Sequence, residues 1–224
     1  MSVNMEAKNT VSADGQVCEY ITTCGKEGGS PRIMIVGNSI TRHEPNCSIG
    51  WNFNHGMAAS APEFDYVHLV QNAILEKHPD AEFCVVQVGR WEMKYRTCDI
   101  DCMFSTAKSF SPDLIITVLG ANIPSAEFTR EDFLREMGKL HAYLSGGRKV
   151  RIIQSSTFFR NDIKNEAIKA YCNISGAEYL YISDIAEDKD NLAIGKFWHE
   201  GVANHPGNNG MKLIAERIIE KIKL

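Results

Sequence analysis

Pro31-Arg-Ile-Met-Ile-Val-Gly-Asn-Ser-Ile-Thr-Arg42 is the stretch that decides the fold. Its front half, Ile33 to Val36, is a short apolar run of β-favouring residues, which is typical of a buried parallel strand. The run stops at Gly37-Asn38, two residues that tolerate the backbone of a tight turn. Ser39 therefore follows the strand directly, where its hydroxyl and N–H would face the crevice at the carboxyl edge of a parallel sheet. Ser39 is a candidate nucleophile, and the alternative is a serine that only caps the next turn.

Strand and helix signals alternate along the rest of the chain. The predicted strands are Ile33–Val36, Phe83–Val88, Leu114–Leu119, Val150–Ile153 and Tyr179–Ile182. The predicted helices begin at Ser60, Thr129, Asn161 and Asn209, and end near His78, Gly146, Gly176 and Ile222. This alternation predicts an α/β fold with one parallel sheet between layers of helices. Residues 31–224 form a single domain in this prediction, and residues 1–30 form an irregular arm with a short hairpin around Ala13-Asp-Gly15.

Composition limits the classes of function. The chain has 224 residues, 44% of them hydrophobic, which suffices for one domain with a sizeable core. A net charge of −4 argues against nucleic acid or an anionic membrane as a partner. Seven cysteines, an odd number in a chain of this size, indicate reduced thiols and a cytoplasmic location. The sequence shows no apolar leader and no run long enough to span a bilayer.

Polar residues follow three of the predicted strands, in Gly37-Asn-Ser39, Gly89-Arg90 and Gly120-Ala-Asn122. These turns converge on one crevice in a doubly wound sheet, and His205-Pro206 precedes the last helix at the same edge. Acyl transfer needs a nucleophile, a base and donors aimed at the oxyanion. We therefore predict Ser39 as nucleophile, His205 as general base, and an oxyanion hole made of Ser39, Gly89 and Asn122. The structural alternatives are a strand-end turn at Gly89, an Asx turn at Asn122 and a capping role for His205.

Three motifs carry a resemblance to a known family. Gly37-Asn-Ser-Ile-Thr41 resembles the first block of the SGNH (GDSL-type) hydrolases, usually Gly-Asp-Ser-Ile-Thr. Gly120-Ala-Asn122 is similar to their Gly-x-Asn block, and His205-Pro206 with Gly210-Met211 is similar to their C-terminal block. The resemblance begins near Arg32 and runs to the end of the chain. It implies a three-layer α/β/α fold with a five-stranded parallel, flavodoxin-like sheet, and hydrolysis of esters or thioesters without a metal or organic cofactor.

The acid of the expected triad departs from the family pattern. The family places an aspartate three residues before the histidine, and that position is Val202 here. If Glu200-Gly-Val-Ala-Asn-His205 is the usual block with two residues inserted, Glu200 takes the place of the aspartate. The alternative is that Glu200 is a solvated loop carboxylate and a main-chain carbonyl orients His205.

The first and second blocks also depart from the pattern. Asn38 replaces the usual aspartate of the first block and keeps its turn chemistry. The second block normally pairs a glycine with a nearby asparagine, whereas this chain reads Val86-Gln-Val-Gly-Arg-Trp-Glu92. Gly89 is the favoured oxyanion donor because it follows the second strand, and Gly56 in the preceding long loop is the competing donor.

Two groups of possible metal ligands occur in the sequence, and neither is complete. Cys98-Asp-Ile-Asp-Cys102 lacks a second pair of ligands at zinc spacing, and His199 with His205 lacks further ligands. We therefore expect no metal.

The substrate is the least determined feature of the sequence. Four aromatic residues lie in predicted loops or near strand ends: Trp51, Phe53, Trp91 and Trp198. They could form an aromatic platform for a sugar ring, and the alternative is that they are ordinary core and lid residues. Small acetyl esters on carbohydrates are a common substrate of the resembled family, so we expect a short-chain carbohydrate O-acetyl esterase. The alternatives are a lysophospholipase or thioesterase, which needs a long apolar channel, and a carbohydrate-binding domain that lost its activity, which Val202 suggests.

Overall fold

The structure is a computed structural model that describes residues 21–223, so the hairpin predicted around Ala13-Asp-Gly15 lies outside the described residues. The strands are β1 (Ile21–Gly25), β2 (Arg32–Gly37), β3 (Glu82–Gln87), β4 (Leu114–Val118), β5 (Arg151–Ser155) and β6 (Glu178–Leu180). The α-helices are α1 (Tyr66–Lys77), α2 (Gly89–Lys94), α3 (Ile100–Ser109), α4 (Arg130–Leu144), α5 (Asp162–Ser175), α6 (Glu200–Ala203) and α7 (Asn208–Ile222). Short 3-10 helices are η2 (Cys47–Ile49), η3 (Pro62–Phe64), η4 (Ser125–Glu127), η5 (Ser183–Glu187) and η6 (Lys189–Asn191).

The strands form one sheet in the order β1-β3-β2-β4-β5-β6. All pairs from β3 to β6 are parallel, and β1 runs antiparallel to β3. The predicted α/β fold and its five parallel strands are confirmed, and the sheet has a sixth, antiparallel strand at its edge. This strand comes from the segment predicted to be irregular. Its β-branched residues pair with the edge of β3, and Gly25, with a φ of 89°, ends it.

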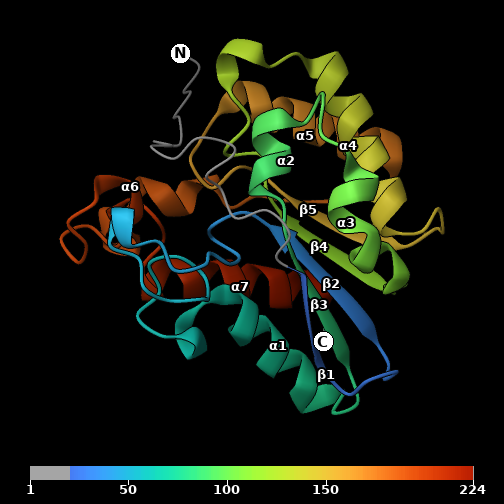
Figure 1. The fold of residues 1–224 in the computed structure, drawn as a ribbon, viewed down its shortest axis with the longest axis horizontal. Helices are drawn as coiled ribbons and strands as arrows, with labels where there is room; N and C mark the ends of the chain where they lie inside the picture. The colour runs from blue at the N-terminus through green and yellow to red at the C-terminus, as the bar shows by residue number, and fades with distance from the viewer. Residues whose placement is uncertain (1–20, 224) are drawn as a thin grey trace.

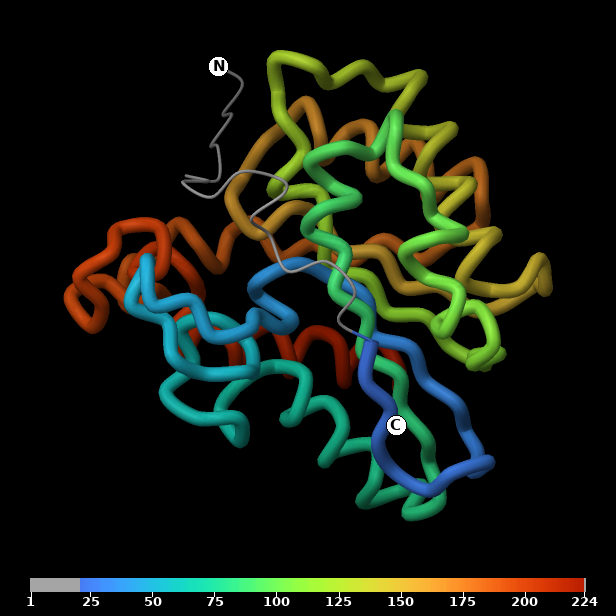
Figure 2. The backbone as a smooth tube through the Cα atoms, viewed as in Figure 1, coloured from blue at the N-terminus to red at the C-terminus, as the bar shows by residue number. Residues whose placement is uncertain are grey.

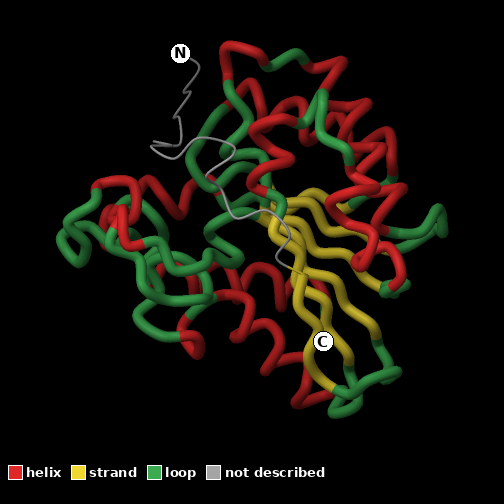
Figure 3. Tube along the Cα trace, viewed as in Figure 1, coloured by secondary structure: helices red, strands yellow, loops and turns green. Residues whose placement is uncertain are grey.

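Helices cover both faces of the sheet (Figures 1 and 3). Ile33 and Ile35 of β2 point into a core shared with α1 and α7. Met34 and Val36 point to the opposite face, into a core shared with α2, α3, α4 and α5. Because both faces of β2 are buried, its sequence is a continuous apolar run rather than an alternating one.

The observed helix starts agree with some of the predicted ones and differ from others. Thr129 caps α4 and Asn161 caps α5, as predicted, and each side chain accepts an N–H from the first turn. The helix predicted from Ser60 instead begins at Tyr66, because Asp65 accepts the His68 N–H and acts as the N-cap. Helices α2 and α3 were not predicted: α2 is short, and the backbone of α3 leaves the helical region at Phe104.

The chain order of the strands reverses around β2. The connection after β2 leads to β3 on one side of it, and the connection after β3 crosses to β4 on the other side. Ligands of open α/β sheets bind in the crevice outside the carboxyl ends of the strands at such a point. Register supports this location, because Gly37 at the end of β2 pairs with both Gln87 and Val118.

Candidate active site

Ser39 lies in a tight turn directly after β2. The side chain of Asn38 accepts the Ile40 N–H (3.1 Å), and its main-chain oxygen accepts the N–H groups of Thr41 and Arg42. Gly37 is required at the strand end, because a Cβ there would clash with the Thr41 side chain and come within 2.6 Å of the Val118 carbonyl oxygen. The turn therefore holds Ser39 at the carboxyl edge of the sheet.

His205 faces Ser39 from the loop before α7. Its Nε2 lies 2.7 Å from Ser39 Oγ, although the two residues are 166 positions apart. Its Nδ1 lies 2.7 Å from the main-chain oxygen of Gly201. A carbonyl only accepts, so Nδ1 carries the proton and donates it to Gly201. Nε2 is then free to accept the proton of the Ser39 hydroxyl, which is the arrangement that a general base needs.

The surroundings of His205 keep its imidazole neutral. Burial is the largest cause and lowers the pKa of His205 to about 4. The hydrogen bond to Gly201 favours the protonated ring, whereas the nearby His43 and His199 disfavour it. His205 is therefore uncharged and available as a base at neutral pH.

The expectation that Glu200 faces Nδ1 of His205 is corrected by this geometry. Residues 200–203 form helix α6 instead of an open loop, and Glu200 is an exposed residue at its start. The carbonyl of Gly201, four residues before His205, takes the position at Nδ1. Of the two alternatives in the sequence, the structure therefore has the main-chain one. His199 caps this helix by accepting the Val202 N–H.

The predicted oxyanion donors lie after neighbouring strands, and most of them already have acceptors. The Asn122 amide donates to Oε2 of Glu92 (2.8 Å). The Gly89 N–H donates to Oε1 of Gln87 (2.7 Å), so the prediction of Gly89 as a free donor is wrong in this structure. The competing Gly56 N–H donates to Asp65 (3.0 Å). Asn122 retains a donor, because its amide has a second N–H.

Glu92 is the residue that sequence reasoning missed. It lies in α2 and is 0% exposed. Its carboxylate accepts the Asn122 amide, the Gly120 N–H and the Asn38 amide (3.3 Å). Burial is the dominant cause that raises the pKa of Glu92 to about 7, and the hydrogen bonds from Gly120, Asn38 and the side chain and backbone of Asn122 act against it. The sequence marks Glu92 only as a single acidic residue next to Trp91, shortly after the predicted strand Phe83–Val88.

Comparison with known proteins finds similarity of fold but no similarity of sequence that identifies a family. No family model matches the sequence, and no curated protein matches it. A two-domain esterase active on acetylated mannans has a TM-score of 0.56 and 16% identity, over 86% of this chain and 48% of that one. The psychrotrophic esterase EstA from Pseudoalteromonas sp. has a TM-score of 0.56 and 14% identity, over 87% of this chain and 97% of that one. A family two carbohydrate esterase from Clostridium thermocellum has a TM-score of 0.55 and 15% identity, over 87% of this chain and 64% of that one.

The chain has the SGNH hydrolase fold. It spans about half of the length of the mannan-active esterase, at 48%, and nearly all of the length of EstA, at 97%.

Glu92 explains one departure from the SGNH pattern. The family's aspartate would present an oxygen where Asn38 presents its amide to Glu92 Oε1. Two carboxylates at that distance repel one another, and one of them would take up a proton. Asn38 therefore suits a fold in which the second block supplies a buried carboxylate.

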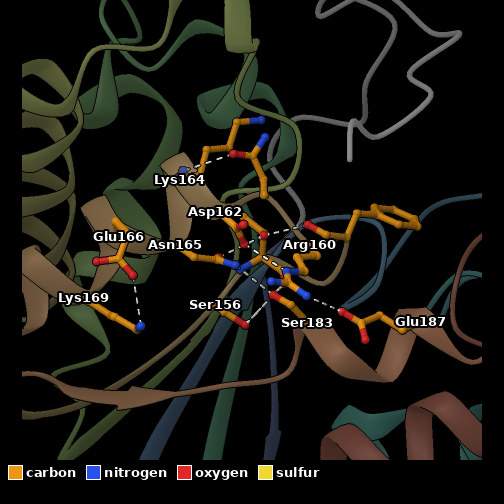
Figure 4. Close-up of polar contacts among 12 residues, drawn as sticks. Ser156, Arg160, Asp162, Lys164, Asn165, Glu166, Lys169, Ser183 and Glu187 are labelled. Carbon is orange, nitrogen blue, oxygen red and sulfur yellow. Dashed lines mark hydrogen bonds and ion pairs between the residues drawn. The ribbon is translucent and has the colours of Figure 1, made fainter. Parts of the chain in front are cut away.

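A second polar network lies at the carboxyl ends of β5 and β6 (Figure 4). Asn165 accepts the Thr157 N–H (2.9 Å) and donates to Ser183 Oγ (3.0 Å), which also meets Ser156 Oγ (2.9 Å). At its rim, Arg160 is paired with the carboxylates of Asp162 (2.9 Å) and Glu187 (3.0 Å). This network joins two strand ends through internal bonds.

The four aromatic residues singled out in the sequence separate into two groups. Trp51 and Trp91 are core residues. Phe53 and Trp198 are 47% and 74% exposed. The indole of Trp198 lies against Gly50, where a Cβ would clash with it. Exposed aromatic rings therefore come from the loop after Ser39 and from the segment before His205.

Those two segments lie side by side at one end of the molecule (Figure 2). They share a small satellite core, separate from the two cores of the sheet. It contains Ile49, Trp51, Met57 and Ala58 from the first segment, and Ala193, Phe197 and Val202 from the second. The ring of Trp51 lies 5.9 Å from that of Phe197. This core fixes the segment after Ser39 against the segment before His205.

Within residues 21–223, no three His, Cys, Asp or Glu side chains gather in a way that suits a metal ion. No helix in the same part of the chain has the length and apolar character to cross a membrane.

Proposed function

We propose that this protein is a serine esterase that hydrolyses short-chain esters, O-acetyl groups on carbohydrates, through an acyl-enzyme on Ser39. The observation that carries the proposal is the contact of 2.7 Å between Ser39 Oγ and His205 Nε2, with Nδ1 of the same ring bonded to Gly201. A hydroxyl whose proton has an acceptor in line is an activated nucleophile.

The proposed steps follow from these groups. Nε2 of His205 takes the hydroxyl proton as Ser39 Oγ attacks the ester carbonyl carbon. The second N–H of Asn122 and the Ser39 N–H donate to the oxyanion that forms. His205 then gives its proton to the leaving alcohol oxygen, which yields the acyl-enzyme. Water attacks this intermediate with His205 again as base, and the acid and free Ser39 are released.

Covalent labelling tests the nucleophile directly. Ser39→Ala should abolish labelling by a fluorophosphonate and leave the fold intact, because one hydroxyl is lost. Ser109→Ala is the matched control, since Ser109 is an exposed serine at the end of α3. Labelling of Ser39→Ala at the level of the wild-type protein would remove the mechanism.

The carbohydrate part of the proposal rests on the exposed rings of Phe53 and Trp198, which belong to the segment after Ser39 and the segment before His205. The fold match to an esterase active on acetylated mannans supports the same substrate class. Trp198→Ala should raise KM for an acetylated oligosaccharide about fivefold, since ring stacking contributes about 1 kcal/mol. Turnover of p-nitrophenyl acetate should stay unchanged. Phe64→Ala, at another exposed aromatic residue, is the control.

An acyl-chain series separates this proposal from a lysophospholipase or thioesterase. Activity should fall from acetyl to octanoyl esters, and a rise would favour the alternatives. A carbohydrate-binding domain without catalysis is the second candidate, because the Gly89 N–H is engaged and Nδ1 of His205 bonds to a main-chain carbonyl. A burst of product from an activated ester rules out that candidate. The free thiols of the described cysteines support a cytoplasmic location, which cell fractionation tests.

A further inference from the structure

The Glu92 carboxylate is a buried ionisable group that the proposed chemistry has not used. It reaches three residues on two turns: Asn38 beside the nucleophile, and Gly120 and Asn122 after β4. These partners lie 28 to 54 positions away in the chain. The carboxylate is thus the point at which the turn after β2 and the turn after β4 are joined.

We propose that Glu92, in its ionised form, is a positioning residue that aims the Asn122 amide at the oxyanion. This inference rests on the proposed esterase function. The amide of Asn122 has two N–H groups in one plane, and one of them is held by Glu92 Oε2 at 2.8 Å. Fixing one N–H fixes the direction of the other, whereas the terminal torsion of an asparagine is otherwise broad.

The chemistry of the three partners requires a carboxylate. Asn38, Gly120 and Asn122 all present N–H donors, and an ionised carboxylate accepts on both oxygens. A protonated carboxyl would direct its own hydrogen at one of these donors. A glutamine at position 92 would do the same with its NH₂ group. In both cases one of the two turns loses its acceptor and Asn122 is released.

Protonation of Glu92 therefore has a distinct pH signature. Burial raises its pKa to about 7, and the groups that face it from the neighbouring turns are uncharged. The charged residues of its own helix are Arg90 and Lys94, and both lower the pKa of the Cys98 thiol. As the pH falls through about 7 the carboxyl gains a proton, so activity should fall there. The His205 pKa of about 4 alone would sustain activity to a much lower pH.

The stability of the protein gives a second, independent signature. A pKa raised in the folded state means that the folded protein binds this proton more tightly than the unfolded chain. Stability therefore decreases as the pH rises from the ordinary pKa of 4.5 toward about 7. Glu92→Gln removes this dependence. A carboxylate whose charge stabilised the fold would instead have a lowered pKa, and the protein would lose stability as the pH fell.

The test measures kcat and KM from pH 4 to pH 9 for the wild-type protein, Glu92→Gln and Glu136→Gln. Glu136 is a buried glutamate of α4 paired with Arg135 and Lys139, so it is a matched control away from the site. In Glu92→Gln we expect kcat to fall 10- to 100-fold with KM within threefold. The acid limb should move from about pH 7 toward pH 4, and the melting temperature at pH 8 should not fall. Glu136→Gln should keep the wild-type profile.

An NMR titration of the Asn122 side-chain amide gives a readout that needs no turnover. Its two proton resonances should shift with a midpoint near pH 7 in the wild-type protein and lose this midpoint in Glu92→Gln. A wild-type acid limb near pH 4, or an unchanged kcat in Glu92→Gln, overturns the role of Glu92 and leaves the esterase intact. If the wild-type protein hydrolyses no ester, the proposed function fails, and the NMR midpoint alone decides for or against Glu92. If Glu92→Gln does not fold, the wild-type profile and titration decide.

Discussion

Two buried polar networks lie at the carboxyl edge of the same sheet, and they are built from different chemistry. At the ends of β2 and β4, one carboxylate, Glu92, accepts three N–H donors. At the ends of β5 and β6, the amide of Asn165 and the hydroxyls of Ser156 and Ser183 bond one another without any charge (Figure 4).

The difference lies in what each network costs the fold. A neutral network in which each donor meets an acceptor is close to neutral or favourable for stability. A buried carboxylate bonded to neutral amides carries a desolvation penalty, which the raised pKa of Glu92 reflects. At the β5 and β6 ends the charged pairs of Arg160 lie at the rim, and the buried bonds that join the turns are between neutral groups. The costly version lies beside Ser39, which is where an arrangement kept for activity belongs.

The largest effect is expected when the charged network loses Asn122, its proposed oxyanion donor. Asn122→Ala should lower kcat by roughly 10²–10³ with little change in KM, because the lost bond strengthens in the transition state. Steady-state kinetics on a short-chain ester measures it. A change confined to KM would assign Asn122 to substrate positioning instead.

A second charge in the same network should have a smaller effect. Asn38→Asp installs the residue that SGNH hydrolases usually carry, at 3.3 Å from Glu92 Oε1. Repulsion should raise the pKa of one carboxyl further, so that the acid limb of activity moves to higher pH and kcat at pH 7 falls about tenfold. A pH–rate profile identical to that of the wild-type protein would contradict the proximity of these two groups.

Breaking the neutral network should reverse the pattern of effects. Asn165→Ala leaves the buried Thr157 N–H without its acceptor and removes one of the bonds to the Ser183 hydroxyl, which should cost about 1–3 kcal/mol of unfolding free energy. Thermal or urea denaturation measures this loss. The kcat of the folded protein should stay within about threefold of the wild-type value, because the network lies two strands from Ser39. If Asn165→Ala is stable but inactive, the neutral network also contributes to activity, and the contrast between the two networks is wrong.

The smallest effect is expected at a carboxylate outside both networks. Glu200→Gln changes an exposed residue, while Nδ1 of His205 bonds to Gly201. Its kcat should therefore change by less than about threefold. A loss of about 10⁴-fold, the scale for removing the acid of a triad, would show that Glu200 reaches the histidine during turnover.

The site residues that could be predicted from the sequence are those that short local motifs mark. Ser39 and His205 each follow from a short pattern next to a strand end or a helix start, and the fold brings those positions together. Gly89 failed as a free donor because the Gln87 side chain turns back onto it, which no local signal reports. Glu92 was missed because its burial depends on partners at least 28 positions away. Glu200 was misplaced because the inserted residues form a helical turn.

The burial of Val202 limits how the Ser39–His205 pair can be altered. Val202 lies three residues before His205 and is buried in the satellite core with Trp51 and Phe197. An aspartate placed there would be an unpaired carboxylate among apolar side chains, which is strongly destabilising. A charged triad therefore cannot be engineered by this one substitution, because the same side chain holds two loops together. The core around residue 202 would have to be redesigned first.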